Sequence, residues 1–207
     1  MVADKADERR PRSSAERDAK GNKADERRPR SSAEGDAKGN DVDAALTGGN
    51  YEVLHHSQFL EELIDSGRLD MTGAKLEERM VYHDSCYLGR HNDVYMAPRN
   101  VIGSLKGVEI VEAGRNGTKG MCCGAGGARM WMEETTGKNV NDERSQELIA
   151  TGASRIAVAC PFCYIMIDDG TKAAGKEDDE VKVADIAMHL LEALEAGDAE
   201  RLESLHD

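Results

Sequence analysis

Five cysteines are the residues of this chain best suited to chemistry, and they fall into three groups along the sequence. Cys86 stands alone, Cys122 and Cys123 are adjacent, and two residues separate Cys160 from Cys163. The stretches between the groups contain 35 and 36 residues, so only the fold can bring these thiols together. Thiolates are the ligands that soft metals and iron–sulfur clusters prefer. The pattern therefore indicates a soft-metal or iron–sulfur site.

The residues around the adjacent cysteines favour the same conclusion. Cys122 and Cys123 must diverge or bridge neighbouring metal ions, and the glycines that follow them let the backbone come close to sulfur. Backbone N–H groups of Gly124, Gly126 and Gly127 are therefore expected to stabilise anionic sulfur and to tune its reduction potential. Five thiolates in one crevice would repel one another and be costly to desolvate, so we expect a cationic centre among them.

Four ionisable side chains near the cysteines are candidates for supporting roles. His83 and Asp84 precede the first cysteine and could donate hydrogen bonds to the site or deliver protons, with packing at a strand end as the competing interpretation. Arg90 and Arg129 could offset the negative charge of the cluster or lie in solvent. The Met-Trp-Met stretch at 130–132 is expected to cover the site or to pack in the core.

The segments that must position the cysteines alternate between strands and helices. Apolar runs predict strands at 79–83, 108–111, 155–159 and 181–183. Helical periodicity and end signals predict helices at 51–64, 97–105, 141–151 with Asn141 as its cap, from 162 to Gly170 or Gly175, and at 184–196. Strands separated by helices imply parallel pairing with right-handed crossovers. We therefore predict an α/β fold with a Rossmann-like parallel sheet and flanking helices.

This order of elements places the cysteines at one edge of the sheet. Cys86 and Cys160 follow the ends of two predicted strands, and the adjacent pair lies in the long loop after the strand at 108–111. Ligands of open parallel sheets bind beyond the carboxyl ends of the strands. We expect the three groups of cysteines to converge at this C-terminal edge. His55 and His56, in the first helix, are interpreted as helix-surface or packing residues.

The first 40 residues differ from the rest in composition. Residues 5–22 recur at 23–40 with one difference, Arg17 against Gly35, and the repeat contains no aliphatic side chain larger than alanine and no aromatic one. Such a segment cannot bury enough apolar surface to offset the entropy of ordering. We predict a disordered, duplicated linker at 1–40, followed by a cysteine-rich domain at 41–207.

Composition narrows the classes of function. The 207 residues carry a formal charge of −13, and the excess of acidic residues lies entirely after residue 40. The domain therefore lacks the basic surface that nucleic-acid binding requires. An odd number of cysteines, two of them adjacent, argues against a secreted disulfide framework. The sequence has no apolar run long enough to span a bilayer and no signal-peptide core. We expect a cytoplasmic domain, held at the inner face of the membrane only through a partner or an upstream region.

The cysteine pattern resembles the cysteine-rich CCG domain of the heterodisulfide reductase family. That family includes the B and D subunits of heterodisulfide reductase and iron–sulfur subunits of glycolate, lactate and anaerobic glycerol-3-phosphate oxidation. The resemblance rests on all five cysteines with Gly124 and the Cys160-Pro161-Phe162-Cys163 stretch, on the flanking segments 83–90 and 121–127, and on Pro98-Arg99. It covers about residues 50–196.

The resemblance implies that the five cysteines ligate a [4Fe-4S] cluster, in a cubane or a non-cubane form. It also implies electron transfer between a flavoprotein dehydrogenase, or another redox subunit, and a quinone or disulfide acceptor, with a membrane-anchored quinone-linked partner as one possibility. Many members of the family carry two such motifs and ferredoxin-type cysteine runs, whereas this chain has one motif and no such run. The chain is expected to be the C-terminal piece of a longer reductase or a single-domain subunit.

Two other interpretations of the cysteines stay open. One is a zinc-stabilised interaction module without redox activity, although zinc takes four ligands and would leave one cysteine unused. The other is a thioredoxin-like thiol oxidoreductase that uses Cys160 and Cys163, which would leave the other three cysteines without a role.

Overall fold

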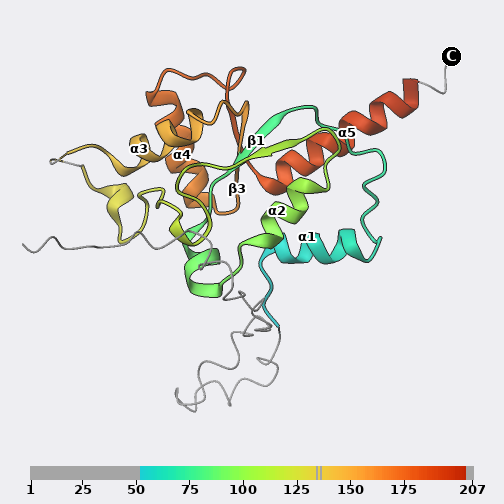
Figure 1. The fold of residues 1–207 in the computed structure, drawn as a ribbon, viewed down its shortest axis with the longest axis horizontal. Helices are drawn as coiled ribbons and strands as arrows, with labels where there is room; N and C mark the ends of the chain where they lie inside the picture. The colour runs from blue at the N-terminus through green and yellow to red at the C-terminus, as the bar shows by residue number, and fades with distance from the viewer. Residues whose placement is uncertain (1–51, 134, 136, 204–207) are drawn as a thin grey trace, which may run out of the picture.

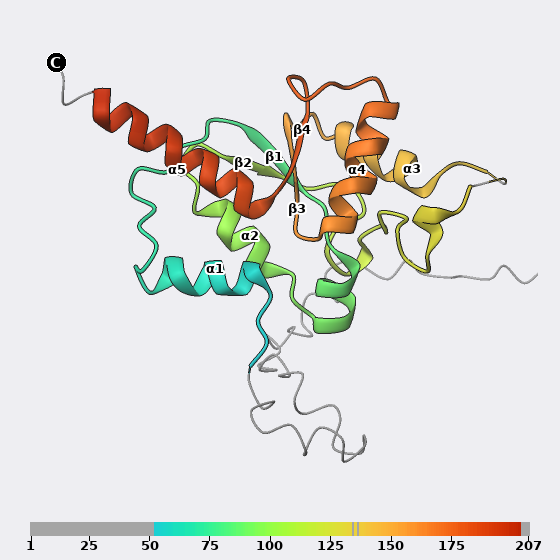
Figure 2. The ribbon, with the colours of Figure 1, turned by 180° about the vertical axis from the view of Figure 1, so that it is seen from behind.

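The computed structural model describes residues 52–203, apart from residues 134 and 136. The predicted linker at 1–40 and its duplicated repeat therefore lie outside the described residues. Four strands and five α-helices form the described part (Figures 1 and 2). The strands are β1 (Arg79–Tyr82), β2 (Glu109–Val111), β3 (Arg155–Val158) and β4 (Lys182–Asp185). The helices are α1 (His56–Asp65), α2 (Met96–Gly103), α3 (Val140–Ile149), α4 (Pro161–Ala173) and α5 (Ile186–Glu203).

The strands form one parallel sheet in the order β2-β1-β3-β4. In its centre Val81 lies opposite Val111 on one side and Ile156 on the other, and β3 continues this register onto β4 with Ala157 opposite Ala184. The predicted α/β fold with a parallel sheet and flanking helices is confirmed.

Helices cover both faces of the sheet, so the domain has three layers. Figures 1 and 2 show α1, α2 and α5 on one side and α3 and α4 on the other. The alternation of side chains along β1 feeds both layers, because Met80 and Tyr82 belong to the core beneath α2 and α5 while Val81 belongs to the core beneath α3 and α4. Since both faces are buried, the central strands β1 and β3 are apolar after their first residue, an arginine in each, rather than alternating.

The helix starts differ from the sequence prediction by one to five residues, and the cap residues of α1 and α3 show where those two helices begin. Helix α1 begins at His56, five residues later than expected, because His55 has an extended backbone and its ring nitrogen accepts the Ser57 N–H at 3.2 Å. The Nε2 atom of His55 lies 3.1 Å from the carbonyl oxygen of Ala159, which ties α1 to the end of β3. This is the packing role expected for His55. Helix α3 begins at Val140 with Asn139 as its N-cap, so the assignment of Asn141 as the cap was wrong.

The helix ends differ as well, most of all at α5. Helix α4 continues through Gly170 and ends at Ala173, two residues before Gly175, the second of the two predicted ends, which has a φ of +75°. Gly170 leaves room for α3, since a Cβ atom there would lie 2.5 Å from Ser145 Oγ. Helix α5 extends to Glu203, beyond the predicted end at residue 196. Sequence signals also missed the π-helix Tyr87–His91 and the 3-10 turns Gly117–Lys119 and Arg129–Trp131. Among the described residues, no helix combines the length and the apolarity needed to cross a membrane.

A histidine in the core makes the stability of the domain sensitive to acid. His189 of α5 is fully buried, with Arg155 Nη1 3.4 Å from its Nδ1 atom and the carbonyl oxygen of Ile156 3.4 Å from its Nε2 atom. Burial, with the positive charge of Arg155, lowers the pKa of His189 from 6.5 to about 4. The folded domain therefore binds a proton at His189 less readily than the unfolded chain does. Below the ordinary pKa of histidine, the unfolded chain takes up this proton before the folded domain does.

The first prediction concerns this histidine. Because the pKa is lowered on folding, the stability contributed by neutral His189 is complete above its ordinary pKa and is lost as the pH falls toward the folded value. Between pH 7 and pH 5 we expect the free energy of unfolding to fall by about 2 kcal/mol through this residue. His189→Gln should remove that part of the pH dependence in anaerobic urea unfolding. An unchanged pH dependence in the variant, or an NMR titration of His189 near its ordinary pKa, would contradict the assignment.

Candidate metal centre

The carboxyl ends of the strands bring the cysteines to one edge of the sheet, as predicted. Cys86 follows β1 after three residues and begins the π-helix, and Cys160 follows β3 after one residue as the N-cap of α4. The pair Cys122 and Cys123 ends the loop that leaves β2. Cys163 lies one turn into α4, so Cys160 and Cys163 present sulfur from the same helix start.

The five thiols form one group. Burial and Cys122 raise the pKa of Cys86, and Cys163 lowers the pKa of Cys123 and of Cys160. The sulfurs of Cys123 and Cys163 lie within 4.8 Å of each other. Cys123 and Cys163 are buried, with 3% and 2% of their surfaces exposed, whereas the other three are partly exposed. The group thus has a closed side inside the core and an open side toward solvent.

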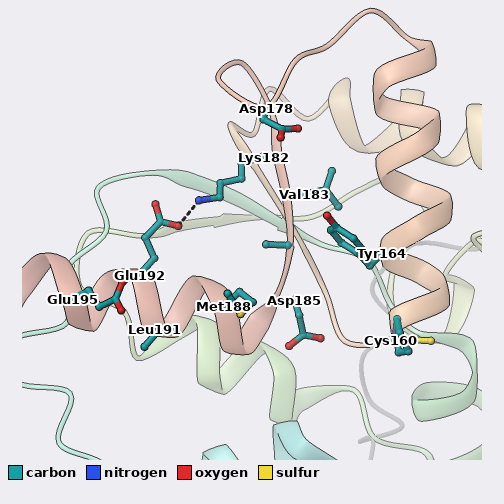
Figure 3. A pocket seen from close by; sticks show the side chains of 12 residues that line it. Cys160, Tyr164, Asp178, Lys182, Val183, Asp185, Met188, Leu191, Glu192 and Glu195 are labelled. Carbon is teal, nitrogen blue, oxygen red and sulfur yellow. Dashed lines mark hydrogen bonds and ion pairs between the residues drawn. The ribbon is translucent and has the colours of Figure 1, made fainter.

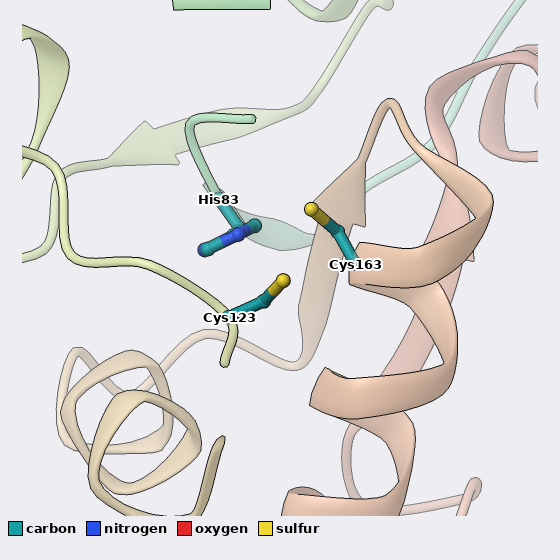
Figure 4. A group of neighbouring side chains, drawn as sticks. All are labelled: His83, Cys123 and Cys163. Carbon is teal, nitrogen blue, oxygen red and sulfur yellow. The ribbon is translucent and has the colours of Figure 1, made fainter. Parts of the chain in front are cut away.

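His83 closes the inner side of the group. It is fully buried, and one of its ring nitrogens and the sulfurs of Cys123 and Cys163 all lie within 4.8 Å of one another. Figure 4 shows the three side chains pointing toward one another from β1, the loop after β2, and α4. Its buried Nε2 atom has no hydrogen-bond partner among the described residues, although the sulfurs of Cys123 and Cys163 lie near the ring. The hydrogen-bond donor role that the sequence suggested for His83 stays a prediction.

An arginine decides which nitrogen of His83 carries the proton. The Nε atom of Arg144 donates to His83 Nδ1 at 3.1 Å. A guanidinium has only donors, so Nδ1 must be the acceptor and Nε2 must carry the hydrogen. A histidine in this tautomer donates through Nε2 and cannot use that nitrogen as a metal ligand. His83 therefore supports the sulfurs and does not replace one of them.

Backbone N–H groups supply further donors to sulfur. Gly124 N lies 3.3 Å from Cys122 Sγ, and the backbone of Ala125 hydrogen-bonds to Cys123. Gly124 has a φ of +95°, and a Cβ atom there would lie 3.1 Å from the Cβ of Val140, so both conformation and space require glycine. Gly126 and Gly127, also expected as donors, are exposed and lie outside these described contacts, whereas Ala125 was not predicted.

The neighbours of each cysteine shift its pKa, and the directions of these shifts indicate what five thiolate ligands would need. A hydrogen bond from the Cys163 thiol, followed by one from His83, lowers the pKa of Cys123 to about 4. The same thiol, with backbone N–H groups at the start of α4, lowers the pKa of Cys160 to about 6. Cys163 itself, held as a donor between two thiolates, has a raised pKa, and burial together with Cys122 raises the pKa of Cys86.

The close spacing of the thiols and their pKa shifts help to choose between an iron–sulfur cluster, a zinc site and a thioredoxin-like cysteine pair. Ligation requires every sulfur to be a thiolate, and five thiolates this close need positive charge among them. Zinc would use four of the five. A thioredoxin-like pair would need Cys160 and Cys163 to act alone, but the sulfur of Cys163 lies within 4.8 Å of that of Cys123 as well. The arrangement fits a polynuclear iron–sulfur centre better than either alternative.

The other three candidate side chains do not face the sulfurs in the contacts that the structure describes. Asp84 accepts from Arg99 at 2.7 and 3.0 Å and from the Gly117 N–H at 2.7 Å, so it joins α2 to the loop that leads to the adjacent cysteines. Arg90 donates to the carbonyl oxygen of Gly120 in the same loop. Arg129 is exposed and begins a 3-10 turn.

The expected apolar cover is mostly absent from the described contacts around the site. Trp131 is 80% exposed and Met132 is 63% exposed, and Met130 is only partly buried. Phe162, between the last two cysteines, and Tyr87, next to the first, are also exposed. The open side of the cysteine group is therefore flanked by exposed aromatic residues.

A groove of about 610 Å³ runs from Cys160 between α4 and α5 (Figure 3). Tyr164 and Met188 supply apolar surface, and Asp185 and Glu192 supply carboxylates. Cys160 lies at the end of the groove, and Figure 3 shows its sulfur pointing away from the other side chains that line the groove.

The domain was compared with known families and proteins. The CCG family model, described as a cysteine-rich domain, matches residues 80–168, which include all five cysteines. A probable iron–sulfur-binding oxidoreductase, FadF, from Bacillus subtilis is 44% identical over 147 residues, which are 71% of this chain and 21% of the relative. An EtfAB:quinone oxidoreductase from Syntrophomonas wolfei is 44% identical over 155 residues, covering 72% of this chain and 21% of that protein.

A third relative is named as a subunit of a heterodisulfide reductase. One subunit of the dihydromethanophenazine:CoB–CoM heterodisulfide reductase from Methanosarcina barkeri is 34% identical over 144 residues, which are 70% of this chain and 34% of that relative. The chain thus spans about a fifth to a third of the length of these relatives. The chain carries a cysteine-rich CCG domain over residues 80–168, and through this domain it is similar to part of proteins named as iron–sulfur oxidoreductases and as a heterodisulfide reductase subunit.

Proposed function

We propose that this domain binds a [4Fe-4S] cluster through Cys86, Cys122, Cys123, Cys160 and Cys163 and relays electrons within an oxidoreductase complex. The observation that carries the proposal is the meeting of all five thiols, from three separate stretches of chain, at one edge of the sheet. The donors aimed at that edge add support, because Gly124 N–H, the Ala125 backbone and His83 each face sulfur. Donors of this kind stabilise anionic sulfur.

A bound cluster would supply one-electron chemistry, and the residues of the chain would set its conditions. Burial of Cys123 and Cys163 excludes water from the inner side. The partly exposed Cys86, Cys122 and Cys160 leave the outer side open to a partner. Electrons would therefore enter and leave on the side flanked by Tyr87 and Phe162, since the opposite side is packed into the core.

The partners follow from the same geometry and from the relatives. We propose a flavoprotein or another redox subunit as electron donor and a quinone or a disulfide as acceptor. The quinone acceptor is suggested by the relative named EtfAB:quinone oxidoreductase, and the disulfide by the relative named heterodisulfide reductase. A relative named as a probable membrane-anchored ferredoxin suggests that a partner, or another part of a longer protein, holds the domain at the cytoplasmic face of the membrane.

The second prediction tests the cluster. Anaerobically purified protein should be brown, hold about four irons with matching acid-labile sulfide, and give an EPR signal on reduction. Cys123→Ser and Cys163→Ser, on the buried side, should each lose most of the iron. Met166→Leu, which changes an apolar neighbour in the same core without removing a sulfur, is the matched control and should keep it. Colourless wild-type protein with about one zinc and no labile sulfide would sink the redox proposal.

The third prediction separates the two acceptors. If the domain is a relay, the reduced protein should be reoxidised rapidly by a quinone analogue in anaerobic stopped-flow experiments and should not turn over a thiol–disulfide substrate. If it reduces disulfides directly, the disulfide should reoxidise it and yield two thiols for every two electrons consumed. Failure of both oxidants in protein that holds the cluster would contradict both acceptor assignments.

A further inference from the structure

Arg144 is the bulkiest fully buried side chain of the described structure. A guanidinium is always charged, and an isolated charge in the core is costly unless it is paired and hydrogen-bonded. Replacing a buried ion pair by apolar residues is often neutral or stabilising, so stability alone is a weak reason for this arginine. Its contacts point instead toward the cysteine group.

The contacts of Arg144 run from the protein surface to the site. Its Nη1 atom donates to Glu147 Oε2 at 2.8 Å and to the carbonyl oxygen of Arg115 at 2.9 Å, while its Nε atom donates to His83 at 3.1 Å. Burial would raise the pKa of Glu147, but the Arg115 backbone N–H and the Arg144 guanidinium outweigh it and hold the pKa below its usual value. The ionised Glu147 pairs with Arg144 at 2.8 Å and with Arg115 at 3.0 Å, so the two arginines share one carboxylate. The N–H at Nε of Arg144 is what reaches the histidine.

The N–H at Nε of Arg144 fixes which nitrogen of His83 carries the hydrogen. It occupies the lone pair of His83 Nδ1 and leaves the hydrogen of His83 on Nε2, a buried atom that has no hydrogen-bond partner in the described structure. The closest sulfurs to this ring belong to the buried pair, Cys123 and Cys163. A donor to cysteine sulfur stabilises the reduced state of a cluster more than the oxidised state, because the reduced cluster carries the extra negative charge.

We propose that Arg144 is a positioning residue, which fixes His83 as a hydrogen-bond donor to the buried cysteine sulfurs and so raises the reduction potential of the cluster. This inference rests on the proposed iron–sulfur function. It assigns a role to Arg144 that acts through His83 rather than through direct contact with the metal.

The chain contains a matched control for this arrangement. Arg155 also reaches the Nδ1 atom of a buried histidine, His189, at 3.4 Å, and also pairs with a carboxylate, Glu192, at 2.8 and 2.9 Å. It begins β3, whereas Cys160 follows the opposite end of that strand. Loss of Arg155 should cost stability as loss of Arg144 does, but it should leave the potential unchanged.

The fourth prediction uses Arg144→Lys, which keeps the positive charge but loses the N–H at Nε. In protein whose iron and sulfide contents match the wild type, EPR-monitored redox titration should show a lower potential. We expect a shift of about tenfold in the one-electron equilibrium constant, which equals about 59 mV. His83→Phe should lower the potential by a similar amount, the double variant should be no lower than either single one, and Arg155→Lys should match the wild type.

A second measurement needs no variant. In wild-type protein labelled with ¹⁵N-histidine, pulsed EPR of the reduced cluster should detect a weak ¹⁵N coupling carried through the N–H···S hydrogen bond. The coupling should vanish in His83→Phe and weaken in Arg144→Lys. Its absence from the wild type, or an unchanged potential in loaded Arg144→Lys, would overturn the role of Arg144. Wild-type protein without iron or sulfide would instead refute the proposed function on which the inference rests.

Discussion

The mutual repulsion of five closely spaced sulfurs is the constraint on which the rest of this structure depends. Thiolates in a partly apolar crevice are stable only if positive charge and hydrogen-bond donors meet them there. The fold provides donors from three directions: the backbone at 124–125, the start of α4, and His83. The thiol network reflects the same demand, because Cys163 serves as a donor to two neighbouring sulfurs. A bound cluster would satisfy all five sulfurs at once.

The site has two sides with different tasks. Cys123 and Cys163 belong to the apolar core between the sheet and helices α3 and α4, together with Leu148 and Ile167. Cys86, Cys122 and Cys160 lie at the partly exposed rim. Electrostatic tuning is strongest where water is excluded, and electron exchange needs a short path to a partner. The buried side is therefore suited to setting the potential, and the open side to exchanging electrons.

Much of this could be predicted from the sequence, because the signals were local or were fixed by topology. Apolar runs marked β1 and β3, and the rule that ligands bind beyond the carboxyl ends of parallel strands placed Cys86 and Cys160 together. Arg144 could not be found in this way. It stands in the stretch Asn141–Ile149, rich in charged and polar residues, which reads as an exposed helix surface, and only the packing of α3 reveals that it is buried.

The exposure of residues 130–132, which were expected to cover the site or pack in the core, also could not be predicted from the local sequence. A Met-Trp-Met stretch after a glycine-rich loop suggests apolar packing, but Ala128 has a positive φ of 63° and turns the chain so that Trp131 and Met132 are exposed. Ion pairs between residues far apart in the sequence could not be predicted either. Asp84 stands next to His83 in the sequence, yet strand alternation turns it away from the sulfurs toward Arg99.

The packing of α3 against α4 connects the core of the domain to its chemistry. Gly170 lets the two helices approach so closely that a single methyl group there would collide with Ser145, the neighbour of Arg144. Ser145 also donates to the carbonyl oxygen of Ile167 on α4 at 3.1 Å, which fixes the two helices relative to each other. Helix α4 carries Cys163 and α3 carries Arg144, so the packing of these two helices, to which this contact belongs, sets the distance between the buried sulfur and the arginine. The close packing at Gly170 thus affects the charges and hydrogen-bond donors near the cysteines through the position of α3, although Gly170 itself does not contact the cysteines in the described interactions.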